Sequence, residues 1–262
     1  MDFIQIVRKI ARENRHVQTV RNAMKKPDRI TVVAHRGGPG MGSHENTMKA
    51  FEKAIECGAD MIETDIRRTQ DGVIVCHHDR GINGKNLSDL TFTEANRLAR
   101  AKGYDIPLLR NLLSLAQGKI QLDIELKEVG YELDVVDQLR DVLKHEDFVM
   151  KSFNDSSVFA IKEIDPRITT GLLVEKSPFG STPLDAAAQL SYEARLALTK
   201  ADFLGPESSL VNRALVARMR FLGKKIFVWT PNSDAEIESM IALGVDAIIT
   251  DKPNRAIELL GR

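Results

Sequence analysis

Three observations in the sequence predict an α/β protein of the (β/α)8, or TIM, barrel class. Short β-rich runs alternate with helical patterns from Ile30 onward, which is typical of a parallel sheet built from βαβ units. Nine such runs occur, but only a tight turn separates the second from the third, so the third is expected to be a hairpin arm and eight parallel strands remain. The chain has 262 residues, close to the roughly 250 of one such barrel. The expected strands are Ile30–Ala34, Met61–Ile66, Val73–His78, Ile120–Lys127, Phe148–Phe153, Thr169–Val174, Asp202–Leu204, Lys225–Thr230 and Ala247–Thr250.

Helical patterns fill the connections between these runs, and many of them stop at glycine or just before proline. The segment Arg80–Ile106 is long for a connection and is expected to form a short insertion at the rim, over the site. We find no linker or repeat, so residues 1–262 are expected to form a single domain, with the barrel over 29–262. The expected helices are Asn46–Cys57, Thr93–Ala101, Pro107–Ala116, Glu132–Lys144, Ser156–Ile164, Pro183–Leu198, Asn212–Leu222 and Asp234–Leu243.

Residues 1–28 are basic and carry apolar residues at helical spacing, which predicts an additional amphipathic N-terminal helix. Packing across the base of the barrel is favoured for this helix over contact with an anionic membrane surface. No apolar run approaches the roughly 18 residues of a membrane span. Lysine plus arginine and aspartate plus glutamate both number 37, so nucleic acid is not an expected partner. Cys57 and Cys76 in so long a chain fit a reducing compartment and a cytoplasmic protein.

A hairpin is predicted where Asp71-Gly72 separates two β-rich runs, because Asp-Gly favours a two-residue turn. In that register Asp65 lies directly opposite His78, and strand alternation places Glu63 on the same face. The hairpin thus brings two carboxylates and an imidazole together before any tertiary contact is considered.

A third carboxylate is expected from the strand Ile120–Lys127, whose polar residues alternate with apolar ones. The polar face, with Glu125 and Lys127, is expected to face the barrel interior rather than solvent at a sheet edge. Glu63, Asp65 and Glu125 would then converge at the carboxyl ends of the strands, where barrel active sites lie. All-oxygen ligands suit Mg²⁺ or Ca²⁺. The alternative for the same acids is an ion-pair network with Arg36 and Lys127.

Two histidines and two cations complete the candidate site. His35 ends the first strand and His78 the hairpin arm, so they are expected to act as general acid and general base. Arg36 and Lys127 could anchor a phosphate. His77 is expected to be structural. The sequence contains neither a phosphate-binding glycine loop nor a serine nucleophile motif.

Several motifs, taken together and in order, resemble the glycerophosphodiester phosphodiesterase family. They span about Thr31 to Asp251, nearly the whole chain. The motifs are His35-Arg36-Gly37, Glu45-Asn46-Thr47, Gly58-Ala59-Asp60, Glu63-x-Asp65, Thr69-x-Asp71-Gly72, His78-Asp79, Glu125-x-Lys127, Ser152-Phe153, Trp229-Thr230-x-Asn232 and Thr250-Asp251.

The resemblance implies a metal-dependent enzyme that hydrolyses small glycerophosphodiesters to an alcohol and sn-glycerol 3-phosphate. It implies Glu63, Asp65 and Glu125 as metal ligands, His35 and His78 as the acid–base pair, and Arg36 and Lys127 as phosphate ligands. Trp229 would either flank the substrate or be an ordinary core aromatic. Two other functions stay open: lysophospholipase D-type activity at a membrane surface, and phosphate binding without catalysis.

Overall fold

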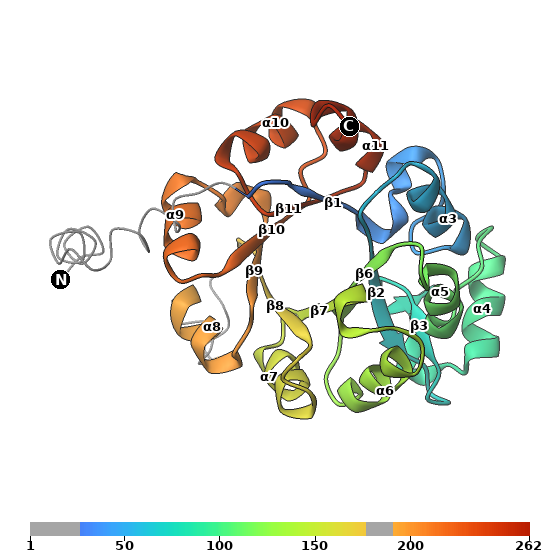
Figure 1. The fold of residues 1–262 in the computed structure, drawn as a ribbon. Helices are drawn as coiled ribbons and strands as arrows, with labels where there is room; N and C mark the ends of the chain where they lie inside the picture. The colour runs from blue at the N-terminus through green and yellow to red at the C-terminus, as the bar shows by residue number, and fades with distance from the viewer. Residues whose placement is uncertain (1–26, 177–190) are drawn as a thin grey trace, which may run out of the picture.

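Eight parallel strands close into a barrel in the computed structural model, which describes residues 27–176 and 191–262 (Figure 1). Each strand pairs with the next around the ring, and β1 closes the ring by pairing with both β11 and β2. This arrangement confirms the predicted (β/α)8 fold. The barrel strands are β1 (Thr31–Ala34), β2 (Met61–Arg68), β6 (Gln121–Leu126), β7 (Phe148–Ser152), β8 (Thr169–Val174), β9 (Phe203–Pro206), β10 (Lys225–Trp229) and β11 (Ala247–Thr250).

Helices cover the outside of the barrel and bury its outward-facing side chains (Figure 1). They are α3 (Met48–Glu56), α5 (Leu109–Ala116), α6 (Glu132–Val142), α7 (Asp155–Ile164), α8 (Tyr192–Thr199), α9 (Arg213–Phe221), α10 (Asp234–Leu243) and α11 (Pro253–Leu259). Short 3-10 turns lie at η1 (His35–Gly37), η2 (Pro39–Met41), η3 (Leu87–Asp89), η4 (His145–Asp147) and η6 (Ser208–Leu210).

Where the expected helices fall within the described residues, they agree with the structure to within a few residues, except at α11 and at the start of α8. The helix α11 was not predicted from the sequence. It begins at Pro253 and is only 7 residues long. The helix expected over Pro183–Leu198 is observed from Tyr192, after the N-cap residue Ser191, and its first part lies outside the described residues. The helix expected over 1–28 also lies outside them, apart from its last two residues.

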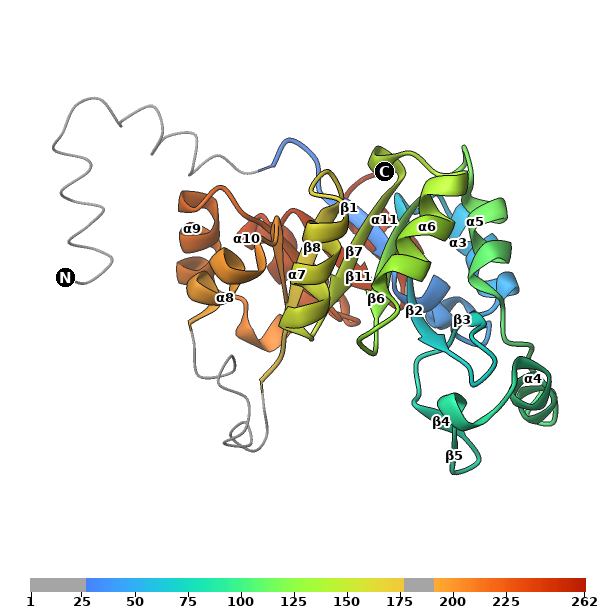
Figure 2. The same cartoon turned by 90° about the horizontal axis from the view of Figure 1, so that it is seen from below.

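The segment between β2 and β6 forms the expected hairpin arm and insertion. Strand β3 (Ile74–Cys76) runs antiparallel to β2, and β4 (Gly81–Ile82), β5 (Lys85–Asn86) and α4 (Phe92–Arg100) follow it. Figure 2 shows this part projecting beyond one side of the barrel, past the end at which β2 finishes. Its buried apolar residues form a cluster of their own that includes Val75, Leu87 and Ala95.

The predicted hairpin register is wrong by one residue. Ile66 pairs with Cys76, so Asp65 lies opposite His77, whose N–H donates to the Asp65 carbonyl, and not opposite His78. The loop has three residues because Thr69 closes it by bonding to Val73. Gly72 takes a φ of +80°, the left-handed conformation that ends a three-residue hairpin loop.

The barrel interior is apolar near the amino ends of the strands and charged toward their carboxyl ends. Phe203 and Phe227 stack in the apolar layer with ring centroids 4.3 Å apart. Gly171 on the neighbouring strand leaves room for them, because a Cβ there would lie 2.1 Å from the Phe203 ring. Above this layer β2 and β6 place Glu63 beside Asp123 and Asp65 beside Glu125.

In the described part of the chain, no helix combines the length and the apolar character needed to cross a bilayer.

Candidate active site

Three buried carboxylates lie together at the carboxyl ends of β2 and β6. Glu63 and Asp65 lie two positions apart on β2, so they share one face of the strand. Glu125 is the register partner of Asp65 on β6. Each residue offers an oxygen atom, and these three oxygens lie within 4.8 Å of one another. An ion with ligand distances of about 2.3–2.6 Å can reach oxygens at that spacing. The side chains of Glu63 and Asp65 are almost fully buried, so water cannot solvate their charge well.

The electrostatics of this acidic trio (Glu63, Asp65 and Glu125) fit a divalent cation. Burial and the charge of Asp65 raise the pKa of Glu125 to about 7, although Lys127 Nζ lies 2.6 Å from its Oε1. Burial also opposes ionisation of Asp65, but Lys127 and Arg36 outweigh it and hold the pKa of Asp65 well below its usual value. An all-oxygen set of ligands matches a hard ion such as Mg²⁺ or Ca²⁺.

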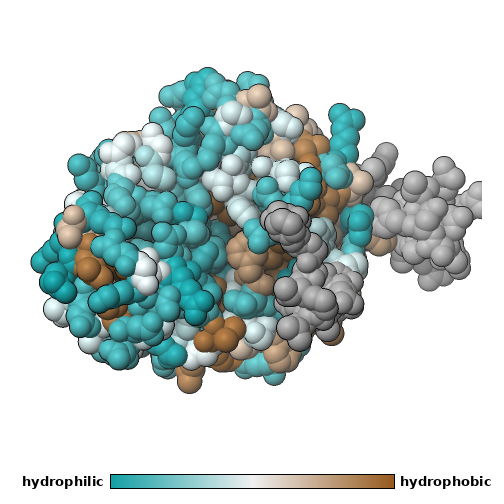
Figure 3. Space-filling view, turned by 180° about the vertical axis from the view of Figure 1, so that it is seen from behind, coloured by the Kyte–Doolittle hydropathy of each residue, from teal (hydrophilic) through white to brown (hydrophobic). Residues whose placement is uncertain are grey.

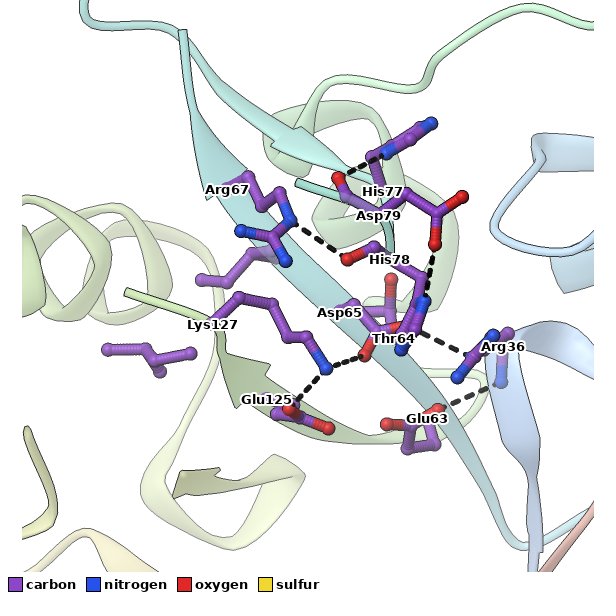
Figure 4. Close-up of polar contacts among 12 residues, drawn as sticks. Arg36, Glu63, Thr64, Asp65, Arg67, His77, His78, Asp79, Glu125 and Lys127 are labelled. Carbon is purple, nitrogen blue, oxygen red and sulfur yellow. Dashed lines mark hydrogen bonds and ion pairs between the residues drawn. The ribbon is translucent and has the colours of Figure 1, made fainter. Parts of the chain in front are cut away.

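Arg36 and Lys127 contact the same acids, as the ion-pair alternative predicts. Arg36 Nε lies 3.2 Å from Asp65 Oδ2, and its Nη1 donates to both carboxylate oxygens of Glu45. Lys127 Nζ lies 3.3 Å from Asp65 Oδ1 (Figure 4). The Arg36 backbone has a φ of 51°, rare for a residue with a side chain, and its N–H donates to Glu63 Oε2.

His35 lies at the end of β1 and is held by a carboxylate from the opposite end of the chain. Its Nδ1 is 2.6 Å from Asp251 Oδ1, and Asn232 donates to the other Asp251 oxygen at 2.6 Å. Burial disfavours the imidazolium, but the bond to Asp251 and the charge of Glu63 outweigh it and raise the pKa of His35. The second ring nitrogen is left for the cavity.

His78 reaches the same cavity because β3 ends at Cys76 and the chain then leaves strand geometry. Its side chain is 33% exposed, its Nδ1 lies 2.9 Å from Asp79 Oδ1, and its carbonyl accepts from Arg67 Nε (Figure 4). His77 turns away, as expected: its ring nitrogens bond to the Asp79 carbonyl and to Tyr104 Oη.

A cavity of about 320 Å³ joins these groups. The predicted site residues that line it are His35, Arg36, Glu63, His78, Glu125, Lys127 and Trp229, whereas Asp65 is buried beside it. Trp229 meets the ring of Phe153 edge to face at 5.6 Å, and its Nε1 donates to the Gly205 carbonyl. Leu173 and Ile249 add further apolar surface, so one wall of the cavity is apolar and the other is charged.

Sequence reasoning missed Lys151 and gave no role to Asp251. Lys151 is 2% exposed, with Nζ 2.8 Å from Asp123 Oδ2 and 3.3 Å from Glu63 Oε1. Burial disfavours its charge, but Asp123 and Glu63 outweigh this and raise the pKa of Lys151. A lysine that directly follows the apolar run Phe148–Met150 in β7 was the available signal for an interior ion pair. For Asp251 the signal was its position directly after the last barrel strand.

Comparison with known proteins gives one consistent result. Residues 35–255 match the family model described as "Glycerophosphoryl diester phosphodiesterase family". The chain is 32% identical to YhdW of Bacillus subtilis, with 87% of this chain and 96% of that protein aligned. It is 31% identical to the glycerophosphodiester phosphodiesterase of Caldanaerobacter subterraneus, with 87% and 97% aligned. An Oleispira antarctica phosphodiesterase structure has the same fold, with a TM-score of 0.77, 21% identity, and 90% and 98% covered.

The family match covers most of the chain and contains both histidines and the acidic trio. The chain therefore belongs to the glycerophosphoryl diester phosphodiesterase family and is a phosphodiesterase of that family.

Proposed function

We propose that this enzyme hydrolyses small glycerophosphodiesters to sn-glycerol 3-phosphate and an alcohol, using His35 and His78 as the acid–base pair and a divalent cation. The observation that carries the proposal is that both imidazoles, the acidic trio, Arg36 and Lys127 lie in or directly beside one cavity of about 320 Å³. The Oleispira structure contains the product sn-glycerol 3-phosphate, which supports this substrate class.

Glu63, Asp65 and Glu125 would hold Mg²⁺ or Ca²⁺, which when bound offsets the charge that develops on the phosphoryl oxygens. Arg36 and Lys127 border the acids and would bind the non-bridging phosphate oxygens as charge-assisted donors. Lys127 then exchanges part of its contact with Glu125 for contact with the substrate.

One imidazole would take a proton from the attacking hydroxyl or water, and the other would give a proton to the leaving oxygen. Asp251 holds Nδ1 of His35, which leaves Nε2 for the proton transfer. Asp79 holds Nδ1 of His78 in the same way. Each histidine thus has a carboxylate that orients its ring.

Trp229 and Phe153 would form the apolar wall against which the carbon chain of the substrate packs. The indole N–H already donates to the Gly205 carbonyl, so Trp229 would contact the substrate through its apolar ring rather than through a hydrogen bond.

The test is release of glycerol 3-phosphate from glycerophosphocholine by the full chain, with and without EDTA and after Mg²⁺ or Ca²⁺ is returned. We expect turnover that EDTA abolishes and the returned cation restores. Turnover of lysophosphatidylcholine alone would support the lysophospholipase D alternative. Binding of glycerol 3-phosphate without turnover of either substrate would support a non-catalytic phosphate-binding protein.

A further inference from the structure

A second cavity lies beside the active-site cavity and has no role in the reaction proposed above. It has a volume of about 420 Å³, and Lys127 lines both cavities, so the two adjoin. We call it the basic cavity because its lining includes four cationic side chains and one acidic side chain. Its lining residues are Arg67, Arg68, Arg80, Ser88, Lys127, Glu128, Val129 and Tyr131.

Arg67 links the wall of the basic cavity to a proposed catalytic residue. It lies near the end of β2 with its side chain 9% exposed. Its Nε donates to the carbonyl of His78 at 2.8 Å (Figure 4). Its Nη1 pairs with Glu128. Because both contacts hold the guanidinium in place, Arg67 forms a rigid part of the cavity wall.

The other two arginines, Arg68 and Arg80, form no strong ion pair within the described residues. Arg68 Nη1 lies 3.5 Å from Asp134 Oδ2, but both side chains are exposed, and such pairs are weak. The guanidinium of Arg68 also lies over the Tyr131 ring, 5.7 Å from its centroid. Arg80 is exposed and has no ion pair within the described ranges 27–176 and 191–262. Glu128 pairs with Arg67, and Lys127 pairs with Asp65 and Glu125, so the positive surplus of the cavity comes from Arg68 and Arg80.

A positive surplus of guanidinium groups favours a phosphate, because the planar fork of arginine donates two parallel hydrogen bonds to adjacent oxygens. Hydrophilic residues dominate the half of the molecule on the side of the insertion, seen at left in Figure 3. Most of the surface that a charged substituent would meet on this side is therefore hydrophilic.

We propose that the basic cavity binds a phosphate carried by the alcohol portion of the substrate, so that the enzyme prefers glycerophosphodiesters whose released alcohol is itself phosphorylated. This inference rests on the proposed function. The two substituents of a phosphodiester leave phosphorus in different directions. When Lys127 holds the phosphodiester group that is hydrolysed, one of its substituents lies along the Trp229 wall. The other substituent, which carries the second phosphate, enters the basic cavity. Water adds to phosphorus and the P–O bond to the alcohol breaks, which yields glycerol 3-phosphate and an alcohol that keeps its own phosphate.

The test compares two substrates that differ by one phosphate: glycerophosphoglycerol, and the same compound with a phosphate monoester on its terminal hydroxyl. We would measure kcat/KM for each, and the dissociation constant of each by calorimetry in EDTA. The proteins are the full-length wild type, Arg80→Ala, and the control Arg110→Ala, which removes an exposed arginine on α5. Arg80 contributes its backbone carbonyl to Leu87, which an alanine retains.

We expect the wild type to prefer the phosphorylated substrate, and Arg80→Ala to reduce that preference roughly tenfold, the effect of losing one hydrogen bond to a charged group. The preference should also fall as salt rises, whereas Arg110→Ala should keep the wild-type ratio. The proposal would be overturned if the wild type and Arg80→Ala showed the same ratio between the two substrates, both in kcat/KM and in dissociation constant. If neither substrate is turned over, the proposed function fails, and the ratio of dissociation constants still decides whether the basic cavity binds the second phosphate.

Discussion

Nδ1 of His35 and Oδ1 of Asp251 lie 2.6 Å apart, although 216 positions separate the two residues in the sequence. The barrel brings them together because β1 and β11 are neighbours, with Ala34 paired to Thr250. Asn232 fixes the second oxygen of Asp251, so the carboxylate cannot rotate away from the imidazole. Asp251 thus holds the His35 ring in a fixed orientation.

Replacement of Asp251 by asparagine should lower kcat strongly, because the amide no longer stabilises a charged His35 and can favour the wrong tautomer. We expect a loss of about 100-fold or more, within the range for a disabled acid or base. Because Asp251 raises the pKa of His35, the variant's pH–rate profile should also shift to lower pH on the limb that reports this histidine. Asp137→Asn, at an exposed position on α6, is the control. An unchanged pH–rate profile in Asp251→Asn would show that Asp251 does not act on His35.

His35→Ala and His78→Ala should each abolish most turnover, by about 10²–10⁴-fold, because each removes one proton-transfer group. The fold should persist, since His78 is partly exposed and His35 lies at the mouth of the barrel. Thermal unfolding and glycerol 3-phosphate release would be measured for both. His145→Gln is the control, because His145 bonds to Asp165 and does not line the cavity. A near-native rate in either alanine variant would exclude that histidine from catalysis.

Stability should depend on Asp60 in a pH-dependent way. Partial burial raises the pKa of Asp60, but hydrogen bonds from Arg262 and Val32 outweigh it and hold the pKa below its usual value. The carboxylate therefore stabilises the fold above its unfolded pKa of about 4, and this contribution is lost as pH falls through the lower folded value.

The measurement is urea unfolding of Asp60→Asn and wild type at pH 7 and at pH 3. We expect the variant to be less stable by about 1 kcal/mol at pH 7, with a smaller difference at pH 3. A difference that does not shrink on acidification would show that the charge of Asp60 is not what stabilises the fold.

Gly171→Ala should destabilise the barrel, because the new Cβ would lie 2.1 Å from ring atoms of Phe203. Overpacking of a closed core costs about 1–3 kcal/mol, and the loss should appear as a lower urea midpoint. Phe203→Leu in the same chain should recover part of the loss, because it removes the ring that clashes. Additive effects of the two substitutions would contradict direct contact as the cause.

Much of the fold could be predicted from the sequence because strand alternation and helix-ending residues are local signals. All eight barrel strands were predicted, as was the inward direction of Glu125 on β6. The helix α11 was missed because a helix of 7 residues presents about two turns of pattern. The hairpin register was wrong because Asp-Gly occurs in both two-residue and three-residue loops, and the side chain of Thr69, bonded to Asp71 and Val73, selects the longer one.

The candidate site was predictable as a set of residues but not as a set of contacts. Glu63, Asp65 and Glu125 meet because they share strand register, which the alternation encodes. His78 lies at the cavity for a different reason from the one predicted, since the chain leaves β3 before reaching it. The contacts of Asp251 with His35 and of Lys151 with Glu63 depend on barrel closure and neighbouring strands, which no local pattern specifies.

The most direct test of the central claim, that the acidic trio binds the cation used in catalysis, is the cation dependence of glycerol 3-phosphate release by wild type and Glu63→Gln. The substitution removes one negative ligand from the three. We predict that the variant needs at least about tenfold more Mg²⁺ or Ca²⁺ for half-maximal rate and binds the ion correspondingly less tightly in calorimetry. Identical cation curves for the two proteins, or full activity of the wild type in excess EDTA, would contradict the claim.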